Sequence, residues 1–350
     1  MARILYGVMG NTHGHIMRSL AIASRLAGEH EFHFVGGGTV PPAVAENYPC
    51  LEVPVLRTAA HHKGRVSIVR AAGQIAGRLT EIPEVKREIR ALIKSWKPTL
   101  ALCDREFFLP FGCAAAGLEC VSIDHSHLLV ACDYEVPAGQ RLSHTLAYGS
   151  DRLLFDRTKK NLIVSFYHPP RRTGRTDEML PPVLRWIVTQ IGPSAGDHVL
   201  CYQTSSTSRA VVEMLRGCGR EVRVYGFNPE QETREGNLVF RPYDDRRILE
   251  DLATCAYAVT NGGHNLVCEA LHYGKPVLCF PVPMLFEQFL NAAQIRALGY
   301  GDYSTLSRPG ANVLRAFEAR LDQYRSNLAG KNFDGTAEVV ERVRQLIPAS

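Results

Sequence analysis

The sequence predicts an α/β protein made of two Rossmann-like domains, each a parallel sheet covered by helices, that face each other across a cleft. Short apolar runs alternate with longer stretches of helical periodicity along the whole chain, which is typical of βαβ units. The length of 350 residues suits two domains of ordinary size. Between them, residues 167–195 hold five prolines and several arginines, a composition that favours an exposed crossover.

We therefore expect an N-terminal domain over 1–175, a C-terminal domain over 176–335, and a helix over 336–350 that packs back on the N-terminal domain. In the first half, the apolar runs predict strands at 2–9, 31–36, 51–56, 99–103, 120–123 and 162–166. Helical periodicity predicts helices at 15–27, 66–78, 83–96 and 109–116. In the second half, strands are expected at 198–202, 221–226, 237–240, 257–260 and 276–280, and helices at 208–215, 248–253, 264–272, 288–298, 311–324 and 336–346.

The composition excludes several classes of protein. Hydrophobic residues make up 45% of the chain, enough for substantial cores, and the formal net charge of +5 is too small to favour nucleic acid as a partner. The longest apolar stretches are too short to cross a bilayer, and the first residues lack the apolar segment of a signal peptide, so we expect a cytoplasmic protein. The ten cysteines are scattered without a C-x-x-C pair and are expected to be reduced core residues.

The loop after the first strand contains three glycines and ends in His15. Its spacing, G-x-x-G-x-x-x-G-H from Gly7, departs from the dinucleotide pattern G-x-G-x-x-G, and three glycines (36–38) stand where that pattern needs an acidic residue. A nicotinamide cofactor is therefore not expected. Because a helix N-terminus disfavours an imidazolium, His15 would stay neutral and could accept a proton. The alternative is that His15 only caps the turn.

A second glycine turn lies in the C-terminal half. Gly262 and Gly263 end a strand and open a helix, where backbone N–H groups and the helix dipole favour a phosphate. Glu269, between one and two turns further, could reach the vicinal diol of a ribose. After the next strand, Glu287 and Gln288 supply donors and acceptors suited to sugar hydroxyls. The alternative is an ordinary tight turn with a solvated Glu269 and a capping Glu287.

A third polar loop follows the fifth strand and contains Asp124, His125 and His127. These residues could form an acceptor pocket, a second acid–base pair or a structural polar loop. Two histidines without a third ligand rarely bind a metal, and the only D-x-D-like triplet, 133–135, lies in the wrong half. We expect no metal site.

These motifs resemble those of GT-B glycosyltransferases, in the broad group that contains the MurG-type and the plant and macrolide UDP-sugar transferases. Residues 10–16, GNTHGHI, are similar to the GGTGGHI loop of the MurG group. Residues 260–269 resemble the HGG…E donor signature, and Glu287-Gln288 its terminal D/E-Q pair. Residues 98–107 resemble the segment that supplies the aspartate of a His–Asp dyad, here Asp104. Arg18 stands where many relatives have proline, and His13 replaces a loop glycine, which leaves either His13 or His15 to face the acceptor.

The resemblance implies an inverting, metal-independent transfer from a nucleoside diphosphate sugar, a UDP-hexose or UDP-HexNAc, to an acceptor hydroxyl. His15 would be the general base, Asp104 would orient it, and Gly14 would contact the acceptor. The leaving diphosphate would meet the backbone of Gly263, His264 and Asn265 and the hydroxyls of Thr204 and Ser205. The backbone near Tyr243 would meet the base, Glu269 the ribose, and Glu287 and Gln288 the sugar. No cofactor beyond the donor co-substrate is expected.

The acceptor could be a small molecule, a glycan or a lipid, and the chain could act as a monomer or a homodimer. Contact with the inner face of a membrane is a further expectation, from basic residues on the crossover and on one predicted helix: Arg171, Arg172, Arg175, Lys86, Arg87, Arg90 and Lys94. Two other functions share this architecture. A hydrolysing UDP-sugar 2-epimerase would release an epimerised free sugar without an acceptor. A non-catalytic sensor of nucleotide sugars would bind the nucleotide through Glu269 and would not need His15.

Overall fold

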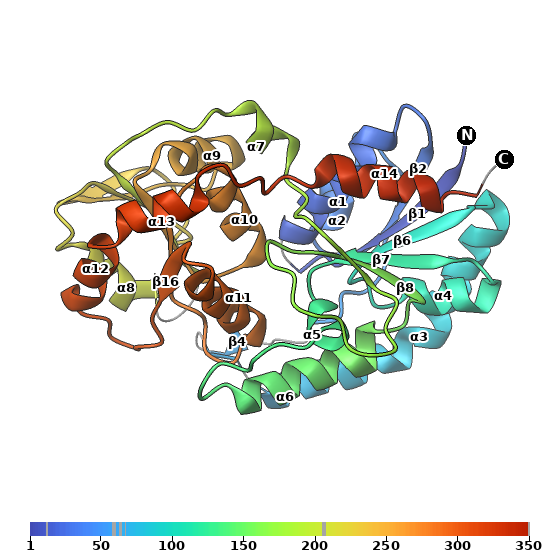
Figure 1. Ribbon diagram of the computed structural model, residues 1–350. Coiled ribbons are helices and arrows are strands. Elements are labelled where there is room, and N and C mark those ends of the chain that lie inside the picture. Colours follow the sequence, from blue (N-terminus) through green and yellow to red (C-terminus); the bar gives the residue numbers. More distant parts are fainter. Residues whose placement is uncertain (12, 58–60, 63–64, 67, 205–207, 349–350) are drawn as a thin grey trace.

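The chain forms two α/β domains, each built on a seven-stranded sheet (Figure 1). The structure is a computed structural model and describes residues 1–348 except 12, 58–60, 63–64, 67 and 205–207. The first sheet has the order β3-β2-β1-β6-β7-β8-β9, with every neighbouring pair parallel. The second has the order β12-β13-β11-β10-β14-β15-β16, and only β12 runs antiparallel to its neighbour. The predicted α/β class is confirmed.

The elements of the first domain follow the expected alternation of strands and helices. Its strands are β1 (Arg3–Val8), β2 (Glu31–Val35), β3 (Cys50–Leu51), β6 (Leu100–Asp104), β7 (Cys120–Asp124), β8 (Lys160–Val164) and β9 (Glu178–Leu180), with a separate hairpin of β4 (His61–His62) and β5 (Arg65–Val66). Its helices are α1 (His13–Leu26), α2 (Val40–Val44), α3 (Ile68–Trp96), α4 (Leu109–Ala116), α5 (Leu128–Ala131) and α6 (Arg141–Ser150), and the last continues into the π-helical turn η1 (Asp151–Phe155).

The second domain repeats this plan. Its strands are β10 (Val199–Tyr202), β11 (Val222–Tyr225), β12 (Thr233–Glu235), β13 (Leu238–Phe240), β14 (Tyr257–Thr260), β15 (Val277–Cys279) and β16 (Gly301–Tyr303). Its helices are α7 (Trp186–Gln190), α8 (Ser208–Leu215), α9 (Asp245–Thr254), α10 (His264–His272), α11 (Phe286–Ala297), α12 (Ala311–Glu318) and α13 (Leu321–Leu328), followed by α14 (Thr336–Leu346).

Several elements differ from the expectation: the helix predicted at 311–324 is divided into α12 and α13, and helix α6 and strands β9, β12 and β16 were not predicted. The helices predicted at 66–78 and 83–96 form the single helix α3, with Pro83 inside it. Pro83 lies on the exposed side of α3, so the carbonyl group that loses its helical partner can bond to water instead. The strand predicted at 51–56 ends at Leu51, because β3 pairs with β2 over only two residue positions.

The ends of the chain tie the two domains together. The last strand of the first sheet, β9, extends to Leu180 and so lies beyond the expected boundary at residue 175. After the second domain, α14 returns to the first, where Val339, Val340 and Val343 join the buried cluster that contains Ile4 and Ile22. In Figure 1, α14 lies beside α1, and the two chain termini are neighbours.

A continuous apolar core joins the facing sides of the domains. It includes Leu128 and Ile163 of the first domain together with Val267 and Leu290 of the second. The carboxyl ends of β1, β6 and β7 therefore lie close to the start of α10, and polar side chains that follow these strands can meet across the interface. None of the helices in the described part of the chain combines the length and hydropathy that crossing a bilayer requires.

Candidate active site

The loop after β1 and the end of β6 bring together the predicted histidine and aspartate. The Nδ1 atom of His15 lies 2.8 Å from Oδ1 of Asp104, although the two residues are 89 positions apart. Asp104 is fully buried, whereas 19% of the His15 side chain is exposed. Since Nδ1 is engaged by the carboxylate, Nε2 is the nitrogen of His15 that can accept a proton.

Close backbone packing explains the glycines around this loop. A Cβ atom on Gly10 would stand 1.7 Å from the carbonyl oxygen of Gly37, so the loop after β1 and the loop after β2 touch through their backbones. These glycines serve loop-to-loop contact, which accounts for the departure from the dinucleotide pattern. Helix α1 begins at His13, whose side chain is outside the described part of the structure.

Arg18, one turn after His15 on α1, completes the pair. Its Nε and Nη2 atoms donate to the two oxygens of Asp104 at 2.9 and 2.8 Å, and its Nη1 atom donates to Oδ1 of Asn265 at 3.2 Å. Burial acts to lower the pKa of Arg18, but the Asp104 carboxylate outweighs this effect and raises it. Arg18 therefore stays charged and connects the first domain to helix α10 of the second.

The predicted donor turn has the expected backbone. Gly262 has φ of 88°, a conformation that favours glycine, and Gly263 is the N-cap of α10 with no atom within 4 Å of where a Cβ would stand. Asn265 donates from Nδ2 to the carbonyl oxygen of Gly14, 2.8 Å away, so this turn contacts the first turn of α1, which carries His15. The N-terminus of α10 is thus placed against the predicted acceptor loop.

The other residues predicted for the diphosphate are only partly placed. Thr204 donates its backbone N–H to Oδ1 of Asn261 at 3.0 Å, which holds the loop after β10 beside the donor turn. Ser205 lies outside the described residues. His264 is buried, and its pKa is lowered, chiefly by that burial and also by the neighbouring His125. His264 is therefore neutral.

Glu269 is buried in an ion pair that the sequence did not indicate. Arg185, from the crossover segment, donates to both carboxylate oxygens of Glu269 at 2.7 and 2.9 Å and also to Asp245 at 2.8 Å. The hydroxyl of Tyr243 donates to the same Asp245 at 2.7 Å. The residues predicted for the ribose and the base therefore form one polar cluster that Arg185 links.

The residues predicted to read the sugar point to different partners. Glu287 accepts a hydrogen bond of 3.1 Å from the hydroxyl of Ser126 in the first domain, whereas Oε1 of Gln288 accepts from the backbone N–H of Val282 at 2.9 Å. Glu287 thus lies at the interface. The side chain of Gln288 instead stabilises the loop between β15 and α11, to which Val282 belongs.

A second histidine–aspartate pair follows β7. Nδ1 of His127 lies 2.6 Å from Oδ2 of Asp124, the same oxygen accepts from Ser122 Oγ at 2.5 Å, and Nε2 of His127 is buried without a partner among the described residues. Burial acts to lower the pKa of His127, but the neighbouring Asp124 carboxylate has the larger effect and raises it. Burial acts to raise the pKa of Asp124, but the neighbouring His127 has the larger effect and lowers it. The pair is an ion pair inside the first domain.

His125 joins the two domains. Its ring stacks on that of His264 with centroids 3.9 Å apart, and its Nε2 atom lies 2.9 Å from Oδ1 of Asn291 on α11. Asn291 in turn donates to the carbonyl oxygen of Gly262 at 3.1 Å. The loop predicted as an acceptor wall therefore braces the donor turn.

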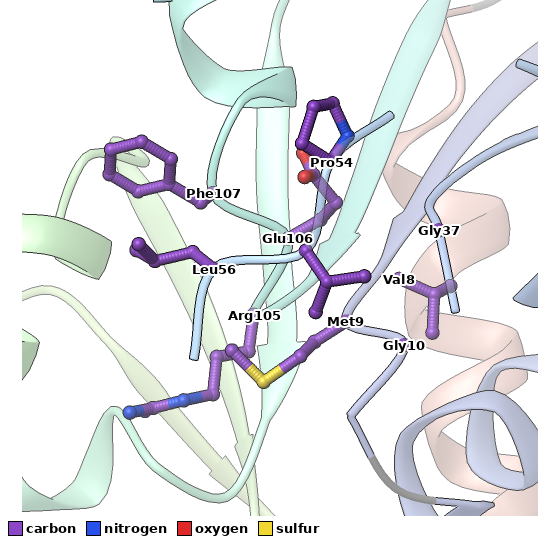
Figure 2. A pocket seen from close by; sticks show the side chains of 10 residues that line it. Val8, Met9, Gly10, Gly37, Pro54, Leu56, Arg105, Glu106 and Phe107 are labelled. Atoms are coloured by element: carbon purple, nitrogen blue, oxygen red, sulfur yellow. The ribbon is translucent and has the colours of Figure 1, made fainter. Parts of the chain in front are cut away.

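Two cavities open on the first domain near these loops. The smaller, of 10 Å³, is lined by the ends of β1 and β6, including Met9, Arg105 and Glu106 (Figure 2). A hollow of 540 Å³ lies between residues 52–57 and α3, and Pro54 and Val55 line both. Burial raises the pKa of Glu106 to about 7, although its carboxylate accepts a backbone N–H from Leu109.

The sequence analysis missed three residues that organise this site: Arg185, Asn291 and Ser126. Arg185 and Asn291 belong to no recognisable spacing, whereas Ser126 lies within the polar loop predicted after the fifth strand. Each acts through a contact between distant segments. Within the described residues, no three His, Cys, Asp or Glu side chains gather as potential metal ligands.

Comparison with known proteins identifies the family. A family model described as glycosyl transferase family 1 matches residues 2–322. The chain belongs to glycosyl transferase family 1. Two uncharacterized glycosyltransferases are similar over short segments. One, of Methanosarcina acetivorans, is 29% identical over 92 residues, which cover 25% of this chain and 24% of the relative. The other, of Methanosarcina mazei, is 38% identical over 64 residues, which cover 18% of this chain and 17% of the relative. The matched segments thus span about a quarter or less of these curated relatives.

Solved structures of glycosyltransferases are similar to this chain over nearly its whole length. A UDP-glucosyltransferase from Polygonum tinctorium superposes with a TM-score of 0.68 at 13% identity, covering 100% of this chain and 99% of that one. The Streptomyces glycosyltransferase SsfS6, complexed with thymidine diphosphate, gives 0.65 at 19% identity, covering 99% and 100%, and MurG of Acinetobacter baumannii gives 0.62 at 12% identity with the same coverage. At these identities the likeness shows the fold. The predicted GT-B architecture and glycosyltransferase class are confirmed.

Proposed function

We propose that this glycosyltransferase moves a sugar from a nucleoside diphosphate sugar to an acceptor hydroxyl with inversion at the anomeric carbon, and that His15 is the general base. The observation that carries the proposal is the 2.8 Å contact between His15 and buried Asp104, at the first turn of α1, which touches the start of α10 through Asn265. An oriented imidazole on one domain thus faces a helix N-terminus on the other.

The proposed step needs only these groups and the two substrates. The acceptor oxygen forms a bond to the anomeric carbon, its proton passes to Nε2 of His15, and the bond from the anomeric carbon to the diphosphate oxygen breaks. Asp104 stabilises the imidazolium that results. Backbone N–H groups at Gly263 and the dipole of α10 would stabilise the departing diphosphate.

The donor is proposed to lie along the second domain with its ribose at Glu269. Each carboxylate oxygen has two lone pairs, so the fork of Arg185 leaves acceptor capacity for ribose hydroxyls. UDP is the favoured nucleotide, from the resemblance to UDP-sugar transferases, with dTDP and GDP as the alternatives. The acceptor would enter from the first domain. Since one chain supplies all these residues, a monomer suffices.

The direct test is a panel of UDP, dTDP and GDP sugars, assayed by the rise in melting temperature that each causes. A tight donor stabilises the folded state by about 2.7 kcal/mol at one hundred times its dissociation constant. Gly263→Ala should lose this stabilisation, because its Cβ would enter the phosphate space without straining the fold. Gly192→Ala, at an exposed glycine equally free of neighbours, is the matched control and should keep it.

Two outcomes would contradict the proposal. If no nucleotide sugar or nucleoside diphosphate stabilises the wild-type chain, the donor site is wrong. If a donor binds and is converted without acceptor to a free epimerised sugar, the protein is an epimerase. Binding that needs Glu269 in a protein whose His15→Ala variant behaves like the wild type would instead make it a sensor.

Contact with an anionic membrane surface is a further part of the proposal, on different residues from those the sequence suggested. Arg175 is engaged by Asp156 and Asp177 inside the protein, whereas Leu142 and Leu146 of α6 and Leu153 of η1 are exposed, the last by 69%. Exposed leucines in a segment that also contains the exposed basic residues Arg141 and Lys159 favour an anionic interface. Leu142→Ser with Leu153→Ser should reduce cosedimentation with phosphatidylglycerol vesicles, and Leu306→Ser, an exposed leucine of the second domain, should not.

A further inference from the structure

Arg18 occupies a position that the general-base mechanism does not explain. It is on α1, three residues after His15, and only 4% of its side chain is exposed. A buried arginine therefore needs a structural reason.

The first reason is the geometry at Asp104. The guanidinium donates through Nε to one carboxylate oxygen and through Nη2 to the other, the two-bond arrangement that fixes a carboxylate most firmly. Ser19 adds only a long contact of 3.4 Å to the same carboxylate. The plane of the Asp104 carboxylate, and with it the ring of His15, is therefore set by Arg18.

The second reason is the charge beside the imidazole. Nη2 of Arg18 lies 3.2 Å from Nδ1 of His15, and both nitrogens approach the same oxygen of Asp104. Asp104 alone would favour an imidazolium, whereas a fixed positive charge at this distance disfavours it. The remaining ionisable neighbour across the interface, His264 on α10, is neutral and stacks on His125.

The third reason is the contact with the other domain. Nη1 of Arg18 reaches Asn265, in the first turn of α10, and Asn265 holds the carbonyl oxygen of Gly14 next to His15. Only an extended fork with several donors can hold Asp104 and Asn265 at the same time. A displacement of α10 would therefore displace His15, and a displacement of His15 would displace α10.

We propose that Arg18 is a positioning residue for the base: it fixes the Asp104 carboxylate and offsets its negative charge at His15. Through Asn265 it also ties the alignment of the base to the donor turn. This inference rests on the proposed function and adds a residue to it.

The test compares Arg18→Gln and Arg18→Lys with Arg25→Gln. Arg25 is on the same helix as Arg18 and is the matched control. In the described part of the structure, its side chain donates a hydrogen bond only to the carbonyl oxygen of Ala21. For Arg18→Gln we expect kcat to fall about a hundredfold, with a smaller change in the KM for the donor, and the acid limb of the pH–rate profile to move to higher pH. Arg18→Lys should restore the position of that limb, because it restores a charge, but not kcat, because one ammonium cannot hold both partners.

A second measurement does not need activity. The pH titration of the His15 imidazole, followed by NMR, should move to higher pH in Arg18→Gln and return towards the wild type in Arg18→Lys. A folded Arg18→Gln variant whose titration and rate profile superimpose on the wild type would overturn the inference. If Arg18→Gln does not fold, wild-type kcat in Arg18→Lys would overturn it, and the expected loss of kcat would support it.

The two proposals fail in different ways. Absence of transfer in the wild-type chain with every donor contradicts the proposed function, while the NMR comparison still decides the role of Arg18. Transfer that depends on His15 but is indifferent to Arg18 contradicts the further inference alone.

Discussion

The first sheet carries two histidine–aspartate pairs at the ends of neighbouring strands, and they differ in what surrounds them. Asp104 ends β6 and binds His15 at 2.8 Å, and Asp124 ends β7 and binds His127 at 2.6 Å. The third partner is a charged arginine in the first pair and the hydroxyl of Ser122 in the second. His15 is partly exposed at the domain interface, whereas His127 is 4% exposed and its Nε2 atom is sealed in.

The comparison teaches that a short His–Asp contact does not by itself make a base. A general base must accept and release a proton easily. The imidazole must therefore be accessible to the substrate, and the negative charge of its partner carboxylate must be partly offset. In the buried pair, the imidazolium of His127 is the nearest counter-charge of Asp124, and the two groups hold each other in their charged forms. The proposed catalysis therefore belongs to the His15 pair, and we propose that the His127 pair contributes to stability.

The largest expected effect separates the two histidines. His15→Ala should lower the transfer rate about 10²–10⁴-fold, the usual value of a general base, and leave the free energy of unfolding almost unchanged. His127→Ala should lower the free energy of unfolding by about 3–5 kcal/mol, because it leaves a buried carboxylate without its counter-charge. Transfer rates per folded molecule and urea titrations measure both. A folded His127→Ala enzyme that is as inactive as His15→Ala would reverse the assignment.

The buried pair should also appear in the pH dependence of stability. The raised pKa of His127 means that its contribution is complete below about pH 6.5, the ordinary value for histidine, and is lost as the pH rises through the folded value. In that window the free energy of unfolding should fall by up to about 1.4 kcal/mol per pH unit.

His127→Gln should lack this slope. The Glu106 carboxyl group, with its pKa raised to about 7 by burial, also lowers stability with rising pH below that value, so the difference between wild type and variant isolates His127. Urea midpoints between pH 5.5 and 9 give the two curves. Parallel curves would mean that His127 is not charged in the folded protein.

The smallest effect concerns the serine beside each carboxylate. Ser122 donates to Asp124 at 2.5 Å inside the core, so Ser122→Ala should cost about 1.5–3 kcal/mol of unfolding free energy. Ser19 is 3.4 Å from Asp104, whose oxygens Arg18 already occupies, so Ser19→Ala should cost about 0.5 kcal/mol or less. Equal losses of unfolding free energy in the two variants would show that Asp104 needs the hydrogen bond from Ser19 even though Arg18 binds both of its oxygens.

Much of the fold could be predicted because apolar runs and helical periodicity are local signals. The alternation along the chain predicted both parallel sheets, and the motif resemblance predicted the pairing of His15 with Asp104. Short edge elements such as β9 and β16 were missed, since two or three residues carry too little pattern. Their existence depends on the neighbouring strand.

The contacts that organise the site could be predicted less well. His15 and Arg18 are three residues apart on a helix, a spacing that places them on one side, so their proximity was within reach. The fork of Arg185 on Glu269 spans 84 positions and the contact of Arg18 with Asn265 spans 247, and no local pattern encodes either. Ion pairs that form only when two domains meet require the tertiary structure.

If His15, and not His127, is the accessible base, chemical modification of the histidines should distinguish the two. Diethyl pyrocarbonate reacts with accessible neutral imidazoles, and mass spectrometry can follow each histidine while donor turnover is measured on the same samples. Our account predicts that turnover is lost in step with modification of His15, that a bound nucleoside diphosphate slows both, and that His127 stays unmodified in the folded protein. Loss of turnover that follows modification of His127, with His15 still intact, would contradict it.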